Sequence, residues 1–168
     1  MNAPRKRPKA VTLPTVSVIP GLKPLYTSRI DIAAPLDLGQ APGGRRRVVN
    51  ILGGAFSGSR MSGRVLPGGA DWQIVRSDGI LEVEARYTLE TDDGALISIT
   101  NRGLRHGPAD VIHRLGAGEA VDPAEYYFRT TPVFETGAAG YAWLNGIIAV
   151  AVGERRADAV IITAYEVT

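Results

Sequence analysis

Residues 81–90, LEVEARYTLE, alternate apolar and polar side chains without a fault. A period of two places successive side chains on opposite faces of a strand, so this segment has one face suited to a core. Asp92-Asp93-Gly94 follows, and these residue types tolerate the backbone angles of a tight turn. Residues 95–103, ALISITNRG, then form the return strand. The pattern predicts an antiparallel β-hairpin with one buried face.

Other short apolar runs, separated by glycine and proline, indicate further strands. Glycine accounts for 20 of the 168 residues. Gly53-Gly54 ends one run, and Gly58 and Gly63 fall within the next strand-like stretch. Glycines in such places are typical of bulges and sharp coiling. A sheet that bends this often tends to close on itself. The other clear strand candidates are residues 25–34, 128–137, 141–153 and 158–168.

Two short helices are expected between the strands. Gly107-Pro108 opens the helical pattern of residues 108–115, and Asp122-Pro123 resembles the start of a single turn over residues 123–128. Many strands with at most two short helices predict a mainly β protein, either a closed or nearly closed antiparallel β-barrel or a sandwich.

The length and charge distribution indicate one globular domain over residues 23–168, preceded by a basic, proline-rich flexible tail over residues 1–22. The basic residues of the tail account for the positive net charge, so nucleic acid is not an expected partner. No apolar run approaches the ~20 residues of a membrane span. We therefore expect a cytoplasmic protein. Two histidines, His106 and His113, and no cysteine give no metal signature, and no cofactor motif is present.

Several ordered motifs resemble the DUF3237 family. They are LPGGADWQ, ARYTLETDDGALISITNRG, GEAVDPAEYYFRTTPVFETG and YAWLNGIIAVAVGERR, and the likeness extends over about residues 24–168. The resemblance implies a compact β-barrel of roughly lipocalin-like shape, found mostly in bacteria and fungi. It implies no particular reaction.

Two acids are candidates for catalysis at the mouth of such a barrel. Asp71 and Glu135 form a possible general acid and base pair, with a pKa raised by an apolar neighbour such as Trp72 or Phe134. The alternative is structural: Asp71 accepts turn amides, and Glu135 pairs with Arg86 or Arg129.

Polar and aromatic residues elsewhere could bind a ligand at the same mouth, although core packing and ion pairing are competing explanations. The run Arg45 to Arg47 is interpreted as a solvated strand entrance rather than an anion site. The candidate binding residues are Trp72, Arg86, Asn101, Tyr127, Arg129, Trp143 and Asn145.

The favoured function is a cofactor-independent enzyme that transfers a proton on a small, oxygenated organic substrate, either aromatic or aliphatic, as a lyase, isomerase or hydratase. Charged and aromatic residues without a cofactor motif motivate this hypothesis. The alternatives are a non-catalytic barrel that binds a small molecule and a purely structural interaction module. Apolar outer strand faces also suggest a homo-oligomer, such as a homodimer.

Overall fold

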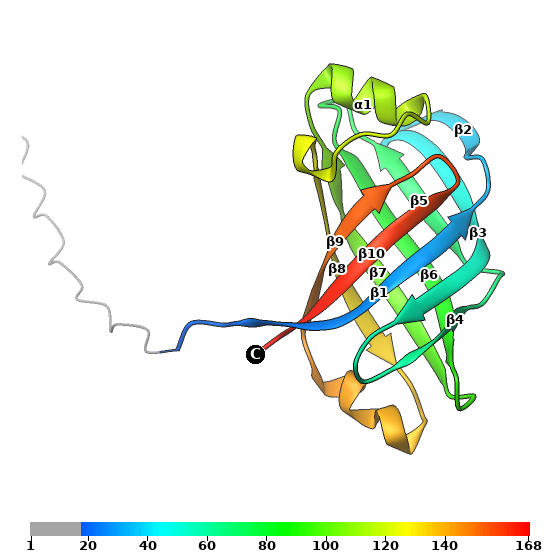
Figure 1. Ribbon diagram of the computed structural model, residues 1–168. Coiled ribbons are helices and arrows are strands. Elements are labelled where there is room, and N and C mark those ends of the chain that lie inside the picture. The colour runs from blue at the N-terminus through cyan, green and yellow to red at the C-terminus, as the bar shows by residue number, and fades with distance from the viewer. Residues whose placement is uncertain (1–17) are drawn as a thin grey trace, which may run out of the picture.

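The computed structural model describes residues 18–168 as a β-barrel with short helices at its two ends (Figure 1). The interpretation of residues 1–17 as part of a flexible tail lies outside the described residues. The helices are α1 (Ala109–Gly116) and the 3-10 helices η1 (Pro123–Glu125) and η2 (Ala139–Gly146). The strands are β1 (Leu22–Ile32), β2 (Leu36–Ala41), β3 (Gly44–Ser57), β4 (Ser62–Val65), β5 (Ala70–Val75), β6 (Leu81–Thr91), β7 (Leu96–His106), β8 (Tyr127–Glu135), β9 (Ala149–Arg155) and β10 (Ala159–Val167).

The sheet closes through β1, which pairs with β10 on one side and with β3 on the other. From β10 the order continues through β9, β8, β7 and β6, and every neighbouring pair is antiparallel. β4 and β5 share one position in the wall, because both pair with β3 and with β6. The predicted closed antiparallel β-barrel is confirmed, and the sandwich alternative is wrong.

Alternation along the strands determines which side chains face the interior. In β6, Leu81, Val83, Tyr87 and Leu89 are buried, as the period of two predicts. β6 pairs with β7 over its whole length, so the predicted hairpin is also confirmed.

Gly54 allows β3 to pass close to β1 where the barrel closes. Its φ is 142°, and a Cβ atom at this position would lie 2.0 Å from the carbonyl oxygen of Arg29. Any larger residue would therefore collide with the β1 backbone.

Helices cover opposite ends of the barrel (Figure 1). Val111 and Leu115 of α1 are buried in a small apolar cluster with Tyr126 and Phe128 at one end. At the other end lies η2, and the larger apolar cluster includes its Leu144. The predicted strand over residues 141–153 is wrong in its first part, because residues 139–146 form η2 and β9 begins only at Ala149.

Candidate functional site

A cavity of about 130 Å³ lies inside the barrel, at the end where α1 supplies part of its lining. Apolar side chains of both core clusters line it, and Leu115 and Gly116 of α1 contribute to its boundary. A cavity of roughly 150 Å³ holds benzene in other proteins, so the space is of the scale of one small ring. The polar side chains that line the cavity are Arg47, Asp71, Gln73, Tyr87, Asn101, Arg105, Thr130 and Arg155.

Asp71 is the only carboxylate among the described residues that line this cavity. Its Oδ1 accepts the main-chain N–H of Glu84 at 3.0 Å, and its Oδ2 accepts Nε2 of Gln73 at 2.6 Å. Burial raises the pKa of Asp71 above its ordinary value, against these hydrogen bonds and the charges of Arg105 and Arg47, which lower it. The carboxyl group is thus both fixed in position and easier to protonate than an exposed aspartate.

Three arginines from different strands face the same cavity: Arg47 of β3, Arg105 of β7 and Arg155 of β9. Burial, followed by the charges of Arg155 and Arg47, lowers the pKa of Arg105 to about 10. All three therefore remain charged at neutral pH. Arg47 Nη2 donates to Gln73 Oε1 at 3.0 Å, so Gln73 links Arg47 to Asp71.

Several polar atoms in the interior have no hydrogen-bond partner among residues 18–168. They include Oδ1 of Asn101, Oγ1 of Thr130, Nε of Arg47 and the hydroxyl oxygen of Tyr87. Buried polar groups are nearly always paired, and each unpaired group costs on the order of 1–3 kcal/mol. A small polar ligand in the cavity would supply the missing partners.

Two of the candidates from the sequence, Asp71 and Asn101, lie in this cavity. They occupy one cross-strand row, since each pairs with Ala85 of β6 from opposite sides. The methyl group of Ala85 is the small side chain between them. Asp71 accepts no turn amide, so that structural alternative is wrong.

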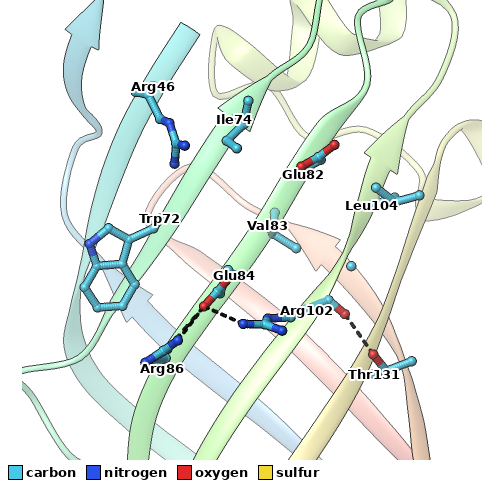
Figure 2. Close-up of a pocket in the computed structure, with 11 residues that line it drawn as sticks. Arg46, Trp72, Ile74, Glu82, Val83, Glu84, Arg86, Arg102, Leu104 and Thr131 are labelled. Carbon is cyan, nitrogen blue, oxygen red and sulfur yellow. Dashed lines mark hydrogen bonds and ion pairs between the residues drawn. The ribbon is translucent and has the colours of Figure 1, made fainter. Parts of the chain in front are cut away.

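Trp72 and Arg86 lie on the outer face of the wall, not at a mouth shared with Asp71. They line a groove of about 680 Å³ over β3, β5, β6, β7 and β8 (Figure 2). Figure 2 shows Glu84 between Arg86 and Arg102, which it contacts at 2.8 and 3.1 Å. These two arginines lower the pKa of Glu84. The charge of Arg86 is therefore balanced by Glu84. The alternative in which Arg86 pairs with Glu135 is wrong.

Tyr127, Arg129 and Glu135 share one face of β8, as the alternation predicted, but it is the outer face. The buried residues of the strand are those between them. Tyr127 stacks on His106 with ring centroids 4.8 Å apart, and the Arg129 guanidinium lies 5.2 Å from the Tyr127 ring. Arg129 donates to the carbonyl oxygen of Phe128, so it does not pair with Glu135.

The expected pairing of Asp71 and Glu135 in one site is wrong, because Asp71 lines the interior cavity and Glu135 lies on the outer face of the barrel wall.

Trp143 and Asn145 belong to η2, at the end of the barrel opposite α1 (Figure 1). Asn145 Oδ1 accepts the Thr136 N–H at 2.9 Å, and its Nδ2 donates to the Thr136 carbonyl at 2.9 Å. The guanidinium of Arg60 lies 3.3 Å from the centroid of the Trp143 ring. Both residues thus make contacts that hold the end of the barrel.

Arg47, Gln73, Arg105 and Arg155 were missed as site residues from the sequence. Arg47 was interpreted as part of a solvated entrance, but alternation along β3 turns it toward the interior while Arg46 lines the outer groove. Arg105 has the same parity as Asn101 in β7, so alternation along this strand is a signal that could have found it.

In the part of the chain that the structure describes, no group of three or more His, Asp or Glu side chains is placed to hold a metal ion. No helix among residues 18–168 has the length and apolar character needed to cross a membrane.

The fold and the site define a closed antiparallel β-barrel with a small, partly polar interior cavity. The family model described as "Protein of unknown function (DUF3237)" matches residues 20–167, and the chain belongs to this family. The resemblance in the sequence motifs is thereby confirmed.

Relatives and solved structures support the same assignment. The UPF0311 protein RPA1785 of Rhodopseudomonas palustris is 43% identical over 145 residues, 86% of this chain and 95% of the relative. Its crystal structure has a TM-score of 0.85 and covers 91% of this chain and 100% of its own. A β-barrel-like protein of Acinetobacter baumannii, ABAYE2633, is 43% identical with a TM-score of 0.80. The match covers 91% of this chain and 99% of the Acinetobacter chain. A crystal structure described as an enzyme from Penicillium herquei has a TM-score of 0.70 at 19% identity, and the match covers 93% of this chain and 100% of the other. At this identity the likeness shows the fold alone.

Proposed function

We propose that this protein is a cofactor-independent enzyme that moves a proton on a small oxygenated substrate bound in the barrel, with Asp71 as the acid and base. The observation that carries the proposal is the position of Asp71, a fixed carboxyl group of raised pKa in a cavity that also holds guanidinium groups. A carboxyl group of raised pKa is better suited than an ordinary one to both halves of a proton transfer.

A single acid favours an isomerisation over a reaction that needs two separated acids. Asp71 takes a proton from a carbon next to a carbonyl group, and the electron pair of the broken C–H bond moves toward the carbonyl oxygen. The guanidinium groups stabilise the resulting enolate. In a substrate with a C=C bond conjugated to the enolate, Asp71 then returns the proton to the far carbon of that bond. The double bond shifts and the carbonyl group re-forms, so the reaction consumes no further reactant.

Tyr87 supports this chemistry from the adjacent strand. Its pKa lies well above the ordinary value because of burial and the nearby negative charge of Asp71. The phenol therefore keeps its proton at neutral pH. The Tyr26 hydroxyl group lies close to the Tyr87 oxygen and lowers the pKa of Tyr87 in part, and the Tyr87 O–H group would donate to a developing oxyanion.

The second candidate is a barrel that binds a small molecule without changing it. One observation favours it: both oxygens of Asp71 already accept hydrogen bonds, from Gln73 and from the Glu84 amide. In that case Asp71 holds β5 to β6 and balances positive charge.

Hydrogen–deuterium exchange at carbon separates the two candidates without knowledge of the product. Small keto acids and hydroxy acids are incubated with the protein in D₂O and followed by ¹H NMR. Proton transfer predicts protein-dependent loss of a C–H signal, which Asp71→Asn abolishes and Glu135→Gln on the outer face leaves intact. Equal exchange in the Asp71→Asn variant would overturn the proposal. A compound that binds and exchanges no carbon-bound hydrogen would support the binding barrel.

A further inference from the structure

The charges that line the cavity do not balance. Three guanidinium groups face one carboxylate there, that of Asp71. Acids outside the cavity compensate two of the arginines in part, since Asp37 lies near Arg47 and Asp158 lies near Arg155. The three guanidinium groups are only partly exposed, and a partly buried cation without an anion is unfavourable, so the imbalance favours binding of a negative charge.

Of the three arginines that line the cavity, Arg105 has the fewest hydrogen-bond partners. It makes no hydrogen bond and no salt bridge to any residue of 18–168 in the structure, although its neighbour Asp71 lies close enough to affect its pKa. Its guanidinium lies 5.8 Å from the centroid of the Phe128 ring, opposite it on β8. The five N–H donors of Arg105 are thus oriented by packing and available to an anion that enters the cavity.

The cavity also offers partners for a second polar group. Thr130 pairs with Gly103, and Gly103 lies between Asn101 and Arg105 on the inner face of β7. Asn101 and Thr130 are each 3% exposed, and each has an unpartnered oxygen. One step of two residues along a strand is about 6.6 Å, so Thr130 lies roughly one step from the Arg105 position and Asn101 roughly two steps, about 13 Å. A hydroxyl group of a ligand would donate to them.

The remaining lining of the cavity determines the body of the ligand. Ile30, Val49, Ile51, Val83 and Ile162 are buried and apolar, and they surround the space beside the polar atoms. An inorganic anion would leave this surface without contacts. An organic anion with a carbon skeleton of about one ring would fill it, in keeping with the volume of about 130 Å³.

We infer that the cavity binds a small hydroxy- or ketocarboxylic acid, whose carboxylate pairs with Arg105 and whose second oxygen meets Asn101 and Thr130. The inference rests on the proposed function in that this anion would be the substrate of Asp71. Arg105 is then the group that selects carboxylates, because its planar fork matches a carboxylate in a two-point contact.

Titration calorimetry with 4-hydroxybenzoate as the probe tests the inference, with the neutral 4-hydroxybenzamide and inorganic phosphate for comparison. We expect the carboxylate to bind at least about tenfold more tightly than the amide. Arg105→Gln should remove this preference, and Arg129→Gln, on the outer face of β8, should retain it. If Arg105→Gln fails to fold, Arg105→Lys keeps the charge without the fork and should weaken binding by a smaller factor.

Equal affinity for the amide and the carboxylate would overturn the inference, as would undiminished binding in Arg105→Gln and Arg105→Lys. Phosphate that binds as tightly as the carboxylate would show a general anion site and would also overturn it. Asp71→Asn distinguishes this inference from the proposed function. That variant removes a like charge from the cavity, so carboxylate binding should persist or become tighter even where proton transfer is lost.

Discussion

Gln73 donates from Nε2 to Asp71 Oδ2 at 2.6 Å, two residues away on the inner face of β5. The other end of the same amide accepts from Arg47. The orientation of the Gln73 amide is therefore determined by a cation on one side and an anion on the other. This link joins β3 to β5 inside the barrel and holds the Asp71 carboxylate in place.

The Gln73 link predicts the effect of Gln73→Leu on the Asp71 carboxyl group. The variant removes a donor that stabilises the ionised form, so the pKa of Asp71 should rise further. The free energy of unfolding should fall by about 1–3 kcal/mol, since buried partners lose their hydrogen bonds. A ¹³C NMR titration of the Asp71 carboxyl carbon measures the first effect and denaturant unfolding the second. Gln40→Leu on the exposed strand β2 serves as the control. An unchanged pKa would show that Gln73 does not stabilise the carboxylate.

Asp71 also predicts a dependence of stability on pH. The pKa of Asp71 is about 3.9 in the unfolded chain and is raised above that value in the folded protein. Between these two pKa values the folded protein keeps the carboxyl group protonated while the unfolded chain releases the proton. The Asp71 contribution to stability is therefore present at low pH and lost as the pH rises through the raised folded value. The difference in unfolding free energy between the wild type and Asp71→Asn should decrease over this window. Urea unfolding across pH 3 to 8 checks this, and a difference that grows with pH would contradict it.

Gly153 packs against Phe128, a residue that lines the cavity, so a larger residue at position 153 should disturb the packing there. A Cβ atom here would lie 2.4 Å from Cδ1 of Phe128, so Gly153→Ala forces the ring to move. Overpacking of this kind should destabilise the protein by about 1–3 kcal/mol. Because Phe128 packs against Arg105, affinity for the carboxylate probe should fall as well. Gly137→Ala, which meets no atom within 4 Å, is the matched control. Thermal unfolding compares the two variants, and equal melting temperatures would show that the ring moves at no cost.

Asn145 predicts a local effect at the far end of the barrel. Its two hydrogen bonds to the Thr136 backbone connect η2 to the end of β8. Asn145→Ala should cost about 1–3 kcal/mol of stability, from two hydrogen bonds of about 0.5–1.5 kcal/mol each. The Thr136 amide should exchange faster with deuterium, while amides near α1 and binding in the cavity should not change. Faster exchange throughout the barrel would show that η2 supports the whole fold.

The sequence by itself determined the wall of the barrel. The period of two in β6, the turn after Thr91 and the glycines of β3 are local signals, and local backbone preferences with burial of one face were enough to interpret them. Asp71 and Asn101 were also found from the sequence, because Asp71 follows a Pro-Gly-Gly turn directly before Trp72 and Asn101 lies toward the end of a predicted strand.

The tertiary structure alone decided which face of each strand is the inside and which residues meet there. Closure of the sheet puts Tyr127, Arg129 and Glu135 on the outer face, and it brings Arg47, Arg105 and Arg155 from three strands around one cavity. The residues that meet are distant in the chain, and alternation defines two faces of a strand without saying which is buried. In β8 both faces carry aromatic side chains, so only packing against the rest of the barrel distinguishes them.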